Sequence, residues 1–142
     1  MRISLGVFFL FEGLGKIRWF SDPSILAGQL NGWLQAAPAH SIAHAYLSKL
    51  AIPGAQVFAR LVPLGEIASG LAMIAGVWTP LFAFIAFFMA LNFHVGSGAL
   101  FKYSFLTNGY GLPVLGGTLA LALAGGGRRK TTKLRVKNES RK

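Results

Sequence analysis

The stretch that decides the fold covers residues 55–97, AQVFARLVPLGEIASGLAMIAGVWTPLFAFIAFFMALNFHVGS. It contains two long apolar segments, 55–78 and 81–97, on either side of the dipeptide Thr79-Pro80. A bilayer core about 30 Å thick requires roughly 20 mostly apolar residues per helix, and each segment meets or approaches that length. Because proline lacks an amide proton and disfavours helix in the residue before it, the dipeptide predicts a tight turn between two membrane-spanning helices.

Two further apolar segments flank this pair, at residues 3–20 and 105–124. Backbone polar groups in lipid must be satisfied within the segment, so each segment is expected to be helical. Charged residues interrupt the first segment and no small-residue cleavage motif follows it, which favours a retained helix over a signal peptide. The sequence therefore predicts an all-α integral membrane protein, a bundle of four transmembrane helices that forms one membrane domain over residues 1–127.

Residues 21–54, which connect the first two segments, are too polar to cross a membrane and too apolar to form a free linker. Asp22 followed by Pro23 is typical of a helix start, since the carboxylate caps free amides and proline suits the first helical position. Apolar side chains then fall mainly on one helical face until Pro38 ends the helix, and a second short helix is expected over residues 42–50. We predict an amphipathic helical connector that lies along the membrane surface or over the bundle.

The formal net charge of +10 is unevenly placed, because eight of the fourteen Lys and Arg residues lie between Arg128 and Lys142. The rest of the chain has no basic surface of the kind that tracks phosphates, which argues against nucleic acid as a partner. The positive-inside rule predicts that the basic tail, residues 128–142, is cytoplasmic, and we expect this tail to be disordered. Four crossings then place the N-terminus in the cytoplasm as well.

Cysteine is absent from the sequence, which removes disulfides, thiolate nucleophiles, Cys-bound zinc and iron–sulfur clusters. His40 and His44 have the spacing of two metal ligands on one helix, but no carboxylate or cysteine accompanies them in the connector. We therefore predict no metal site. Phosphate-loop, dinucleotide-binding and haem-attachment motifs are also missing from the sequence, so no cofactor is recognisable from a motif.

Polar residues within the predicted spans are the candidates for function. A charge inside a span costs roughly 2.5–3.5 kcal/mol on insertion scales, so it is expected to point inward and find a partner. Glu12 and Lys16 are four residues apart, in the favourable order for an ion pair, and helix geometry places Glu12 roughly 12 Å and Glu66 roughly 17 Å from the outer ends of their spans. The other spans also bring polar groups to this outer half. The candidate cluster consists of Glu12, Lys16, Arg60, Glu66, Asn92, His94, Asn108 and Tyr110.

We expect aromatic residues to line this cluster, namely Phe8, Phe11, Phe88 and Phe93. Such a convergence is typical of a buried polar site, and it also fits paired charges that only fix the register of the helices. His94 has the one imidazole within a predicted span and can exchange protons near neutral pH, or it can be a hydrogen-bonded structural residue. The sequence assigns no catalytic residue.

Short motifs occur in and between the predicted helices: Arg2-x-Ser-Leu-Gly and Glu12-Gly-x-Gly-Lys16 in the first, Leu64-Gly-Glu66-x-x-x-Gly70 in the second, Trp78-Thr-Pro80 at the turn, Asn92-x-His94 in the third, and Leu106-Thr-Asn108-Gly at the fourth. Over roughly residues 2–125 the sequence resembles the DoxX and DoxD-like membrane proteins, and the last two motifs are similar to the DoxD-like branch. The resemblance implies a four-helix, multi-pass protein of the cell inner membrane.

The resemblance also implies a quinone-associated membrane subunit, because family members named for thiosulfate:quinone oxidoreductase pass electrons from a sulfur compound to quinone. Quinone is then the ligand to expect, and the expected partners are the lipid bilayer and another protein subunit or a second copy of the chain. Whether the protein is an enzyme is left open. A non-enzymatic scaffold or assembly subunit is one alternative, and a small solute or proton carrier is another, since inward charges also mark transport paths.

Overall fold

The computed structural model describes residues 1–124, and every regular element in that range is helical. The longest helices are α4 and α5, and a short turn of 3₁₀ helix and a short turn of π helix extend α1 and α3. In chain order the elements are α1 Arg2–Gly15, the 3₁₀ turn Ile17–Phe20, α2 Ser24–Ala36, α3 Ile42–Tyr46, the π turn Leu47–Ala51, α4 Ala55–Ala75, α5 Thr79–Gly96, α6 Tyr103–Thr107 and α7 Leu112–Ala124.

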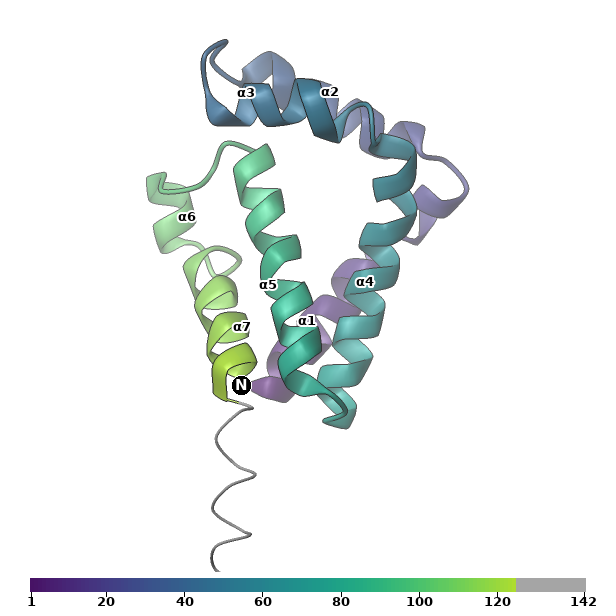
Figure 1. Cartoon of the computed structure of the whole chain (residues 1–142), viewed down its shortest axis with the longest axis vertical. Helices are drawn as coiled ribbons and strands as arrows, with labels where there is room; N and C mark the ends of the chain where they lie inside the picture. The colour runs from purple at the N-terminus through teal and green to yellow at the C-terminus, as the bar shows by residue number, and fades with distance from the viewer. Residues whose placement is uncertain (125–142) are drawn as a thin grey trace, which may run out of the picture.

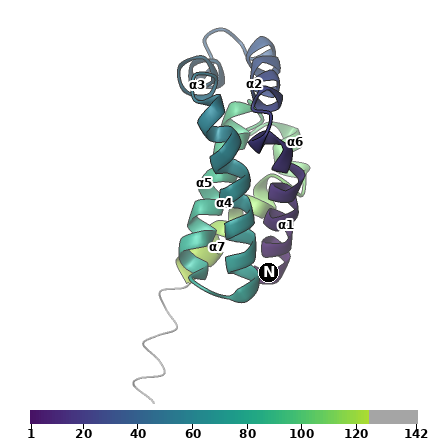
Figure 2. The same ribbon diagram turned by 90° about the vertical axis from the view of Figure 1, so that its right-hand side faces the viewer.

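The long helices form two pairs, α1 with α4 and α5 with α7, that converge at the end holding the N-terminus (Figure 1). The helices α2 and α3 lie across the opposite end, as the second view confirms (Figure 2). Buried apolar side chains fill the narrow end: Leu5, Phe9, Met73, Ala83, Ala86 and Val114. A second apolar cluster holds the connector on α4: Leu26, Leu30, Leu47, Ala51, Ala55 and Ala59. The space between the two pairs therefore widens toward the connector.

Glycines allow α1 and α4 to pack backbone against backbone. A Cβ atom built on Gly70 would lie 2.5 Å from the Leu10 nitrogen and 2.7 Å from the Gly6 oxygen, distances that no real Cβ atom tolerates. Small residues of this kind are what allow membrane helices to approach closely. The close approach brings the last turn of α1 alongside the middle of α4.

The turn between α4 and α5 differs in register from the prediction. Gly76 ends α4 in the left-handed conformation, with φ +76°, and its amide donates to the Ala72 oxygen. Glycine is favoured at such a helix end because it has no Cβ to strain this conformation. The predicted second segment, 55–78, is thus too long, and Thr79-Pro80 lies in the first turn of α5 rather than between the helices.

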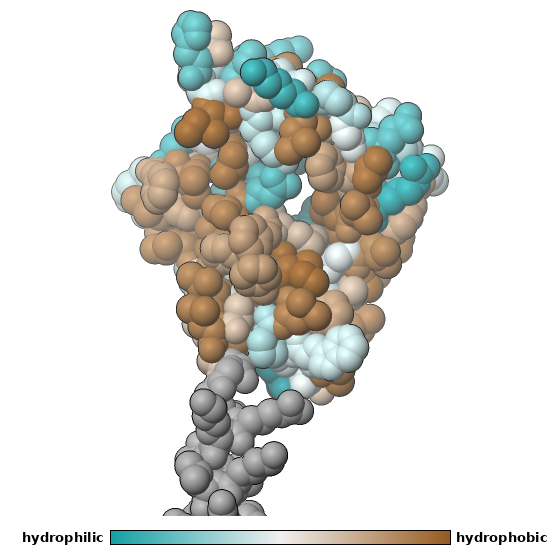
Figure 3. All heavy atoms as spheres, viewed as in Figure 1, coloured by the Kyte–Doolittle hydropathy of each residue, from teal (hydrophilic) through white to brown (hydrophobic). Residues whose placement is uncertain are grey.

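Within the described residues, α4 and α5 are the two helices long and apolar enough to cross a membrane. Their apolar windows are only 33% and 22% buried, so few residues are fully enclosed, and both helices carry exposed apolar side chains such as Leu61, Leu71 and Phe84. A helix in the core of a soluble protein would be mostly buried, so these exposed apolar faces indicate a lipid environment. Figure 3 shows one face of the molecule, with apolar residues over its middle and hydrophilic residues gathered at the end that holds the connector.

The outer two predicted spans are shorter than expected. α1 ends at Gly15 after 14 residues, and α7 has 13 residues, or about 21 Å and 20 Å of helix. The predicted fourth span, 105–124, is broken between α6 and α7, where Gly111 contacts the Phe105 carbonyl so closely that a Cβ would collide with it. These lengths do not confirm four crossings.

The connector matches its prediction more closely. The Asp22 carboxylate accepts a hydrogen bond of 3.0 Å from the Ser24 amide, and α2 ends before Pro38. The helix begins at Ser24, so Pro23 lies one position before the first helical residue rather than at the first helical position that was predicted. The second short helix is present as α3 and the π turn that follows it. The predicted basic tail, 128–142, lies outside the described residues.

Candidate functional site

A cavity of about 410 Å³ lies between the two helix pairs. This volume falls in the range of sites that bind small organic molecules, roughly 300–1,000 Å³. Five aromatic side chains make up much of its wall: Phe8, Phe9, Phe93, Phe105 and Tyr110. Six polar side chains interrupt that aromatic lining: Glu12, Lys16, Glu66, His94, Ser104 and Asn108.

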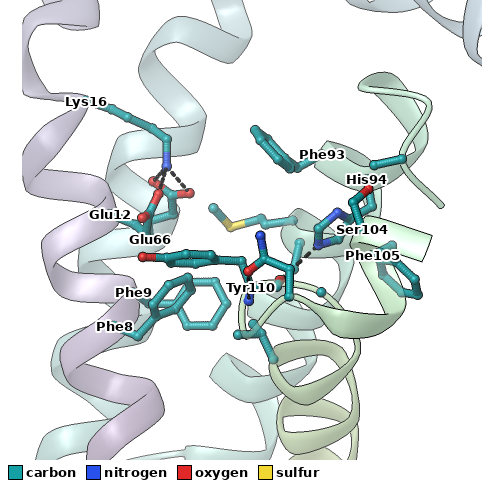
Figure 4. A pocket seen from close by; sticks show the side chains of 16 residues that line it. Phe8, Phe9, Glu12, Lys16, Glu66, Phe93, His94, Ser104, Phe105 and Tyr110 are labelled. Carbon is teal, nitrogen blue, oxygen red and sulfur yellow. Dashed lines mark hydrogen bonds and ion pairs between the residues drawn. The ribbon is translucent and has the colours of Figure 1, made fainter. Parts of the chain in front are cut away.

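Lys16 joins two carboxylates at one wall of the cavity (Figure 4). Its Nζ atom lies 2.8 Å from Glu12 Oε2 on α1, and 2.7 Å and 2.9 Å from Glu66 Oε1 and Oε2 on α4. The predicted ion pair of Glu12 with Lys16 is confirmed, and it extends to a second helix. Lys16 can reach both partners because it caps the C-terminal end of α1, opposite the middle of α4.

The charges of this group do not balance. Two carboxylates share one ammonium, which leaves a formal charge of −1 on the wall of an otherwise apolar cavity. An ammonium has three N–H donors, and three carboxylate oxygens already accept them. Glu66 has a 10% exposed side chain, whereas that of Glu12 is 41% exposed, so Glu12 is the carboxylate that a ligand can reach.

His94 lies on the wall opposite this group, near the end of α5 (Figure 4). Its Nε2 atom lies 3.0 Å from the Tyr110 carbonyl oxygen, and because a carbonyl only accepts, Nε2 carries the proton. The ring packs edge-on between Phe93 and Phe105, with centroids 5.6 Å and 5.0 Å away. Nδ1 is buried and has no hydrogen-bond partner among the described residues.

Tyr110 links the two walls. Its backbone accepts the His94 hydrogen bond, and its amide donates to Asn108 Oδ1 at 2.9 Å, which shapes the loop between α6 and α7. Its ring packs 5.6 Å from the Phe8 ring of α1. Figure 4 shows the Tyr110 hydroxyl directed toward the Glu12 and Glu66 carboxylates, so the side chain reaches across the cavity from the loop.

A smaller cavity of about 70 Å³ adjoins the first, beneath the connector. It shares Lys16, Glu66, Met89 and Phe93 with the larger cavity, and its other walls include Trp19 and Trp33. Figure 3 shows the molecular surface hollowed at this level, below the hydrophilic end. The Lys16 group, which consists of Lys16, Glu12 and Glu66, thus lies between two cavities rather than within a packed core.

Six of the eight predicted cluster residues line the larger cavity, and two do not. Arg60 is exposed on α4, where its guanidinium donates to the Gln56 carbonyl at 3.4 Å. It lies six residues before Glu66, about 240° around the helix, and therefore faces away from the site. Asn92 lines the smaller cavity instead.

The aromatic lining was predicted in part. Phe8 and Phe93 line the cavity as expected. The prediction for Phe11 and Phe88 is wrong, because these residues are 67% and 50% exposed and do not line the cavity. Phe9, Phe105, Ser104 and Met89 line it without having been predicted. Phe105 begins the predicted fourth span and Ser104 immediately precedes it, where no spacing rule distinguishes an inward side chain from an outward one.

No curated protein and no solved structure matches the sequence. The family model described as DoxX matches residues 1–97, more than half of the 142-residue chain. The matched part contains Glu12, Lys16, Glu66 and His94, whereas Asn108 and Tyr110 lie beyond it. With its exposed apolar helices and this match, the chain belongs to the DoxX family of membrane proteins.

Proposed function

We propose that the protein is a DoxD-like, quinone-associated subunit of a thiosulfate:quinone oxidoreductase-like complex, and that its larger cavity holds a quinone head group and exchanges protons with it. The single observation that carries this proposal is the cavity itself, where a carboxylate group from α1 and α4 faces a histidine from α5 across aromatic walls. Polar groups at two sides of an apolar slot are what a planar ring with two opposed oxygens requires.

The lining residues suggest how such a ring would be held. The Phe8, Phe93 and Tyr110 side chains offer ring faces and edges for stacking against an aromatic head group. Reduction of a quinone to its quinol takes up two electrons from the partner subunit and two protons from water. The partly exposed Glu12 carboxylate can take up such a proton and pass it to the ring, and the Tyr110 hydroxyl directed toward it can relay one. Quinone supplies the two-electron chemistry when bound.

The source of electrons is proposed to be a second protein. The chain has no cysteine, so it offers no thiolate to react with a sulfur compound. Within residues 1–124 the polar side chains of the cavity offer proton exchange and hydrogen bonding. A partner subunit that oxidises the sulfur substrate would complete the reaction, which is why we propose a subunit of a complex and not a complete enzyme.

The direct test is to purify the protein from native membranes in mild detergent and to identify co-purifying quinones and proteins by mass spectrometry. We expect bound quinone in the native chain and its loss in Glu66→Gln, which weakens the Lys16–Glu66 pair that holds Glu12 at the cavity. Arg60→Gln is the matched control, because Arg60 is exposed on the same helix outside the cavity. A native chain that carries partners but no quinone would contradict the proposal.

We also propose four crossings of the cell inner membrane, with both termini in the cytoplasm. In this proposal the 3₁₀ turn completes the crossing that α1 begins, and α6 completes that of α7 across the break at residues 108–111. The absence of cysteine makes the test direct, since a single introduced cysteine is the only one to react. A membrane-impermeant maleimide should label Ala39→Cys in intact cells, and Thr131→Cys only after permeabilisation; the reverse pattern would invert the topology.

The Lys16 group also favours a second candidate function, a non-enzymatic scaffold or assembly subunit. Lys16 ties α1 to α4 along the same face where Gly70 brings the helix backbones together. In this role Glu12→Gln should lower the melting temperature of the detergent-solubilised protein and reduce recovery of partners. Quinone binding would then be missing from the native protein too, which separates this function from the first.

A further inference from the structure

The strong hydrogen-bond donors of the larger cavity are already occupied. Lys16 gives all three of its N–H groups to Glu12 and Glu66. His94 gives its Nε2 proton to the Tyr110 carbonyl oxygen. Lys16 and His94 can therefore donate a hydrogen bond to a ligand in the cavity only if each breaks a hydrogen bond within the protein.

A charged acceptor, in contrast, is free. Lys16 contacts Glu12 through Oε2, and Glu12 Oε1 accepts no hydrogen bond from any residue in the part of the chain that the structure describes. The Glu12 side chain is 41% exposed and lines the cavity, and the group to which it belongs has a formal charge of −1. Glu66 offers no such atom, since both of its oxygens are bonded to Lys16.

The neutral polar groups of the cavity do not change the finding that its free charged group is a hydrogen-bond acceptor. The hydroxyls of Tyr110 and Ser104 can donate or accept, so they suit either kind of ligand. The Asn108 amide can donate through its nitrogen, because its Oδ1 is bonded to the Tyr110 amide. A neutral bond of that kind is roughly half as strong as one that involves a charged partner.

We infer that the cavity binds the reduced quinol in preference to the oxidised quinone. In the bound state Glu12 Oε1 accepts a hydrogen bond from a quinol hydroxyl. This inference rests on the proposed function and adds the redox form that the site selects. A quinol presents O–H donors, whereas a quinone presents only carbonyl acceptors, whose lone pairs face those of the Glu12 carboxylate. The aromatic walls stack equally well against both forms, so the carboxylate decides between them.

The test measures two affinities on the full chain in detergent, under anaerobic conditions, by isothermal titration calorimetry. The probes are a benzoquinone that carries one isoprene unit and the matching quinol. A hydrogen bond to a charged group strengthens binding by about tenfold or more, so we expect the native chain to bind the quinol at least about tenfold more tightly than the quinone.

Two variants identify the residue responsible. Glu12→Gln keeps an oxygen for Lys16 but replaces the free anionic oxygen with a neutral amide, and it should bring the two affinities to within about twofold. Asp22→Asn, which removes a carboxylate of the connector outside the cavity, should leave the native preference unchanged. A Glu12→Gln variant that keeps the tenfold preference would overturn the assignment of Glu12.

The native chain alone keeps the inference falsifiable if a variant does not fold. Equal affinities for quinol and quinone, or a preference for quinone, would overturn the inference and leave the proposed quinone site intact. Binding of neither form would overturn the proposed function together with the inference. A tenfold preference that Glu12→Gln removes would support both.

Discussion

Lys16 at the C-terminal end of α1 and Glu66 on α4 are fifty residues apart in the sequence, yet Lys16 Nζ lies 2.7 Å from Glu66 Oε1. Their side chains are 16% and 10% exposed, so the pair is mostly withdrawn from water. In such surroundings an ion pair persists only if its hydrogen bonds are complete, and here every N–H of Lys16 has a partner. The pair therefore fixes the register of α1 against α4 and holds the Glu12 carboxylate at the cavity.

The first prediction concerns the ammonium that two carboxylates share. Lys16→Met keeps much of the side-chain volume and leaves Glu12 and Glu66 close together without a cation. Removing one partner of a buried pair leaves an uncompensated charge, and we expect a loss of about 3 kcal/mol in the free energy of unfolding. The measurement is the thermal unfolding of the detergent-solubilised protein.

A double variant separates this effect from lost packing. In the Lys16→Met background, Glu66→Gln should recover part of the stability, because it removes one of the two unpaired charges. Lys102→Met is a control for the loss of a cation from the surface. If Lys16→Met unfolds at the temperature of the native chain, the pair contributes nothing and its role in fixing the register is wrong.

The second prediction concerns the contact between the backbones of α1 and α4. In Gly70→Ala the new methyl group would lie 2.5 Å from the Leu10 nitrogen, and helix backbone cannot yield as a flexible side chain can. The helices must separate, so we expect a clear drop in melting temperature and a weaker Lys16–Glu66 pair. Gly116→Ala, on α7, is the matched control, because a Cβ there meets nothing within 4 Å and alanine favours helix.

The lengths of the apolar segments predicted the helical class, and the Asp22-Pro23 and Pro38 signals predicted the connector. The polar residues of the site followed from a separate physical rule. Charged and polar groups in apolar helices must face inward, so their depth along each helix is enough to predict that Glu12, Lys16, Glu66 and His94 lie together. The depth of a residue along a helix does not show, however, which way its side chain faces. Arg60 is close to Glu66 in sequence but faces the other way, and only the angle around the helix shows this.

The remaining differences depend on pairings between segments. The importance of Gly6 and Gly70 follows from the packing of α1 against α4, which a single sequence does not reveal. The predicted fourth span looked continuous because Asn108, Gly109 and Gly111 are surrounded by apolar residues. The helix breaks there because the Asn108 side chain bonds to the Tyr110 amide, a local alternative to the helical hydrogen bond.

The third prediction concerns the turn between α4 and α5. Gly76 has φ +76°, and a Cβ there would collide with the guanidinium of Arg2. Gly76→Ala should therefore destabilise the protein through backbone strain of about 1–2 kcal/mol and through the clash with Arg2. Gly15→Ala, where a Cβ meets nothing within 4 Å, is the control. If Arg2→Ala restores the stability of Gly76→Ala completely, the clash and not the strain is responsible.

The fourth prediction concerns the hydrogen bond between His94 and the loop that carries Tyr110. His94→Phe keeps an aromatic ring between Phe93 and Phe105 but removes the Nε2 donor, so the Tyr110 carbonyl loses its bond. A bond of this kind contributes about 0.5–1.5 kcal/mol, and we expect amide hydrogen exchange in residues 108–111 to accelerate by about three- to tenfold.

The consequence for binding follows from the position of Tyr110. A looser loop no longer holds the Tyr110 ring against Phe8 or directs its hydroxyl toward the carboxylates, so quinone and quinol should both bind more weakly in His94→Phe. His40→Phe, an exposed substitution in the connector, should change neither exchange nor binding. Unchanged hydrogen exchange at residues 108–111 in His94→Phe would show that Asn108 alone maintains the loop. The claim that His94 on α5 holds this loop at the cavity would then be wrong.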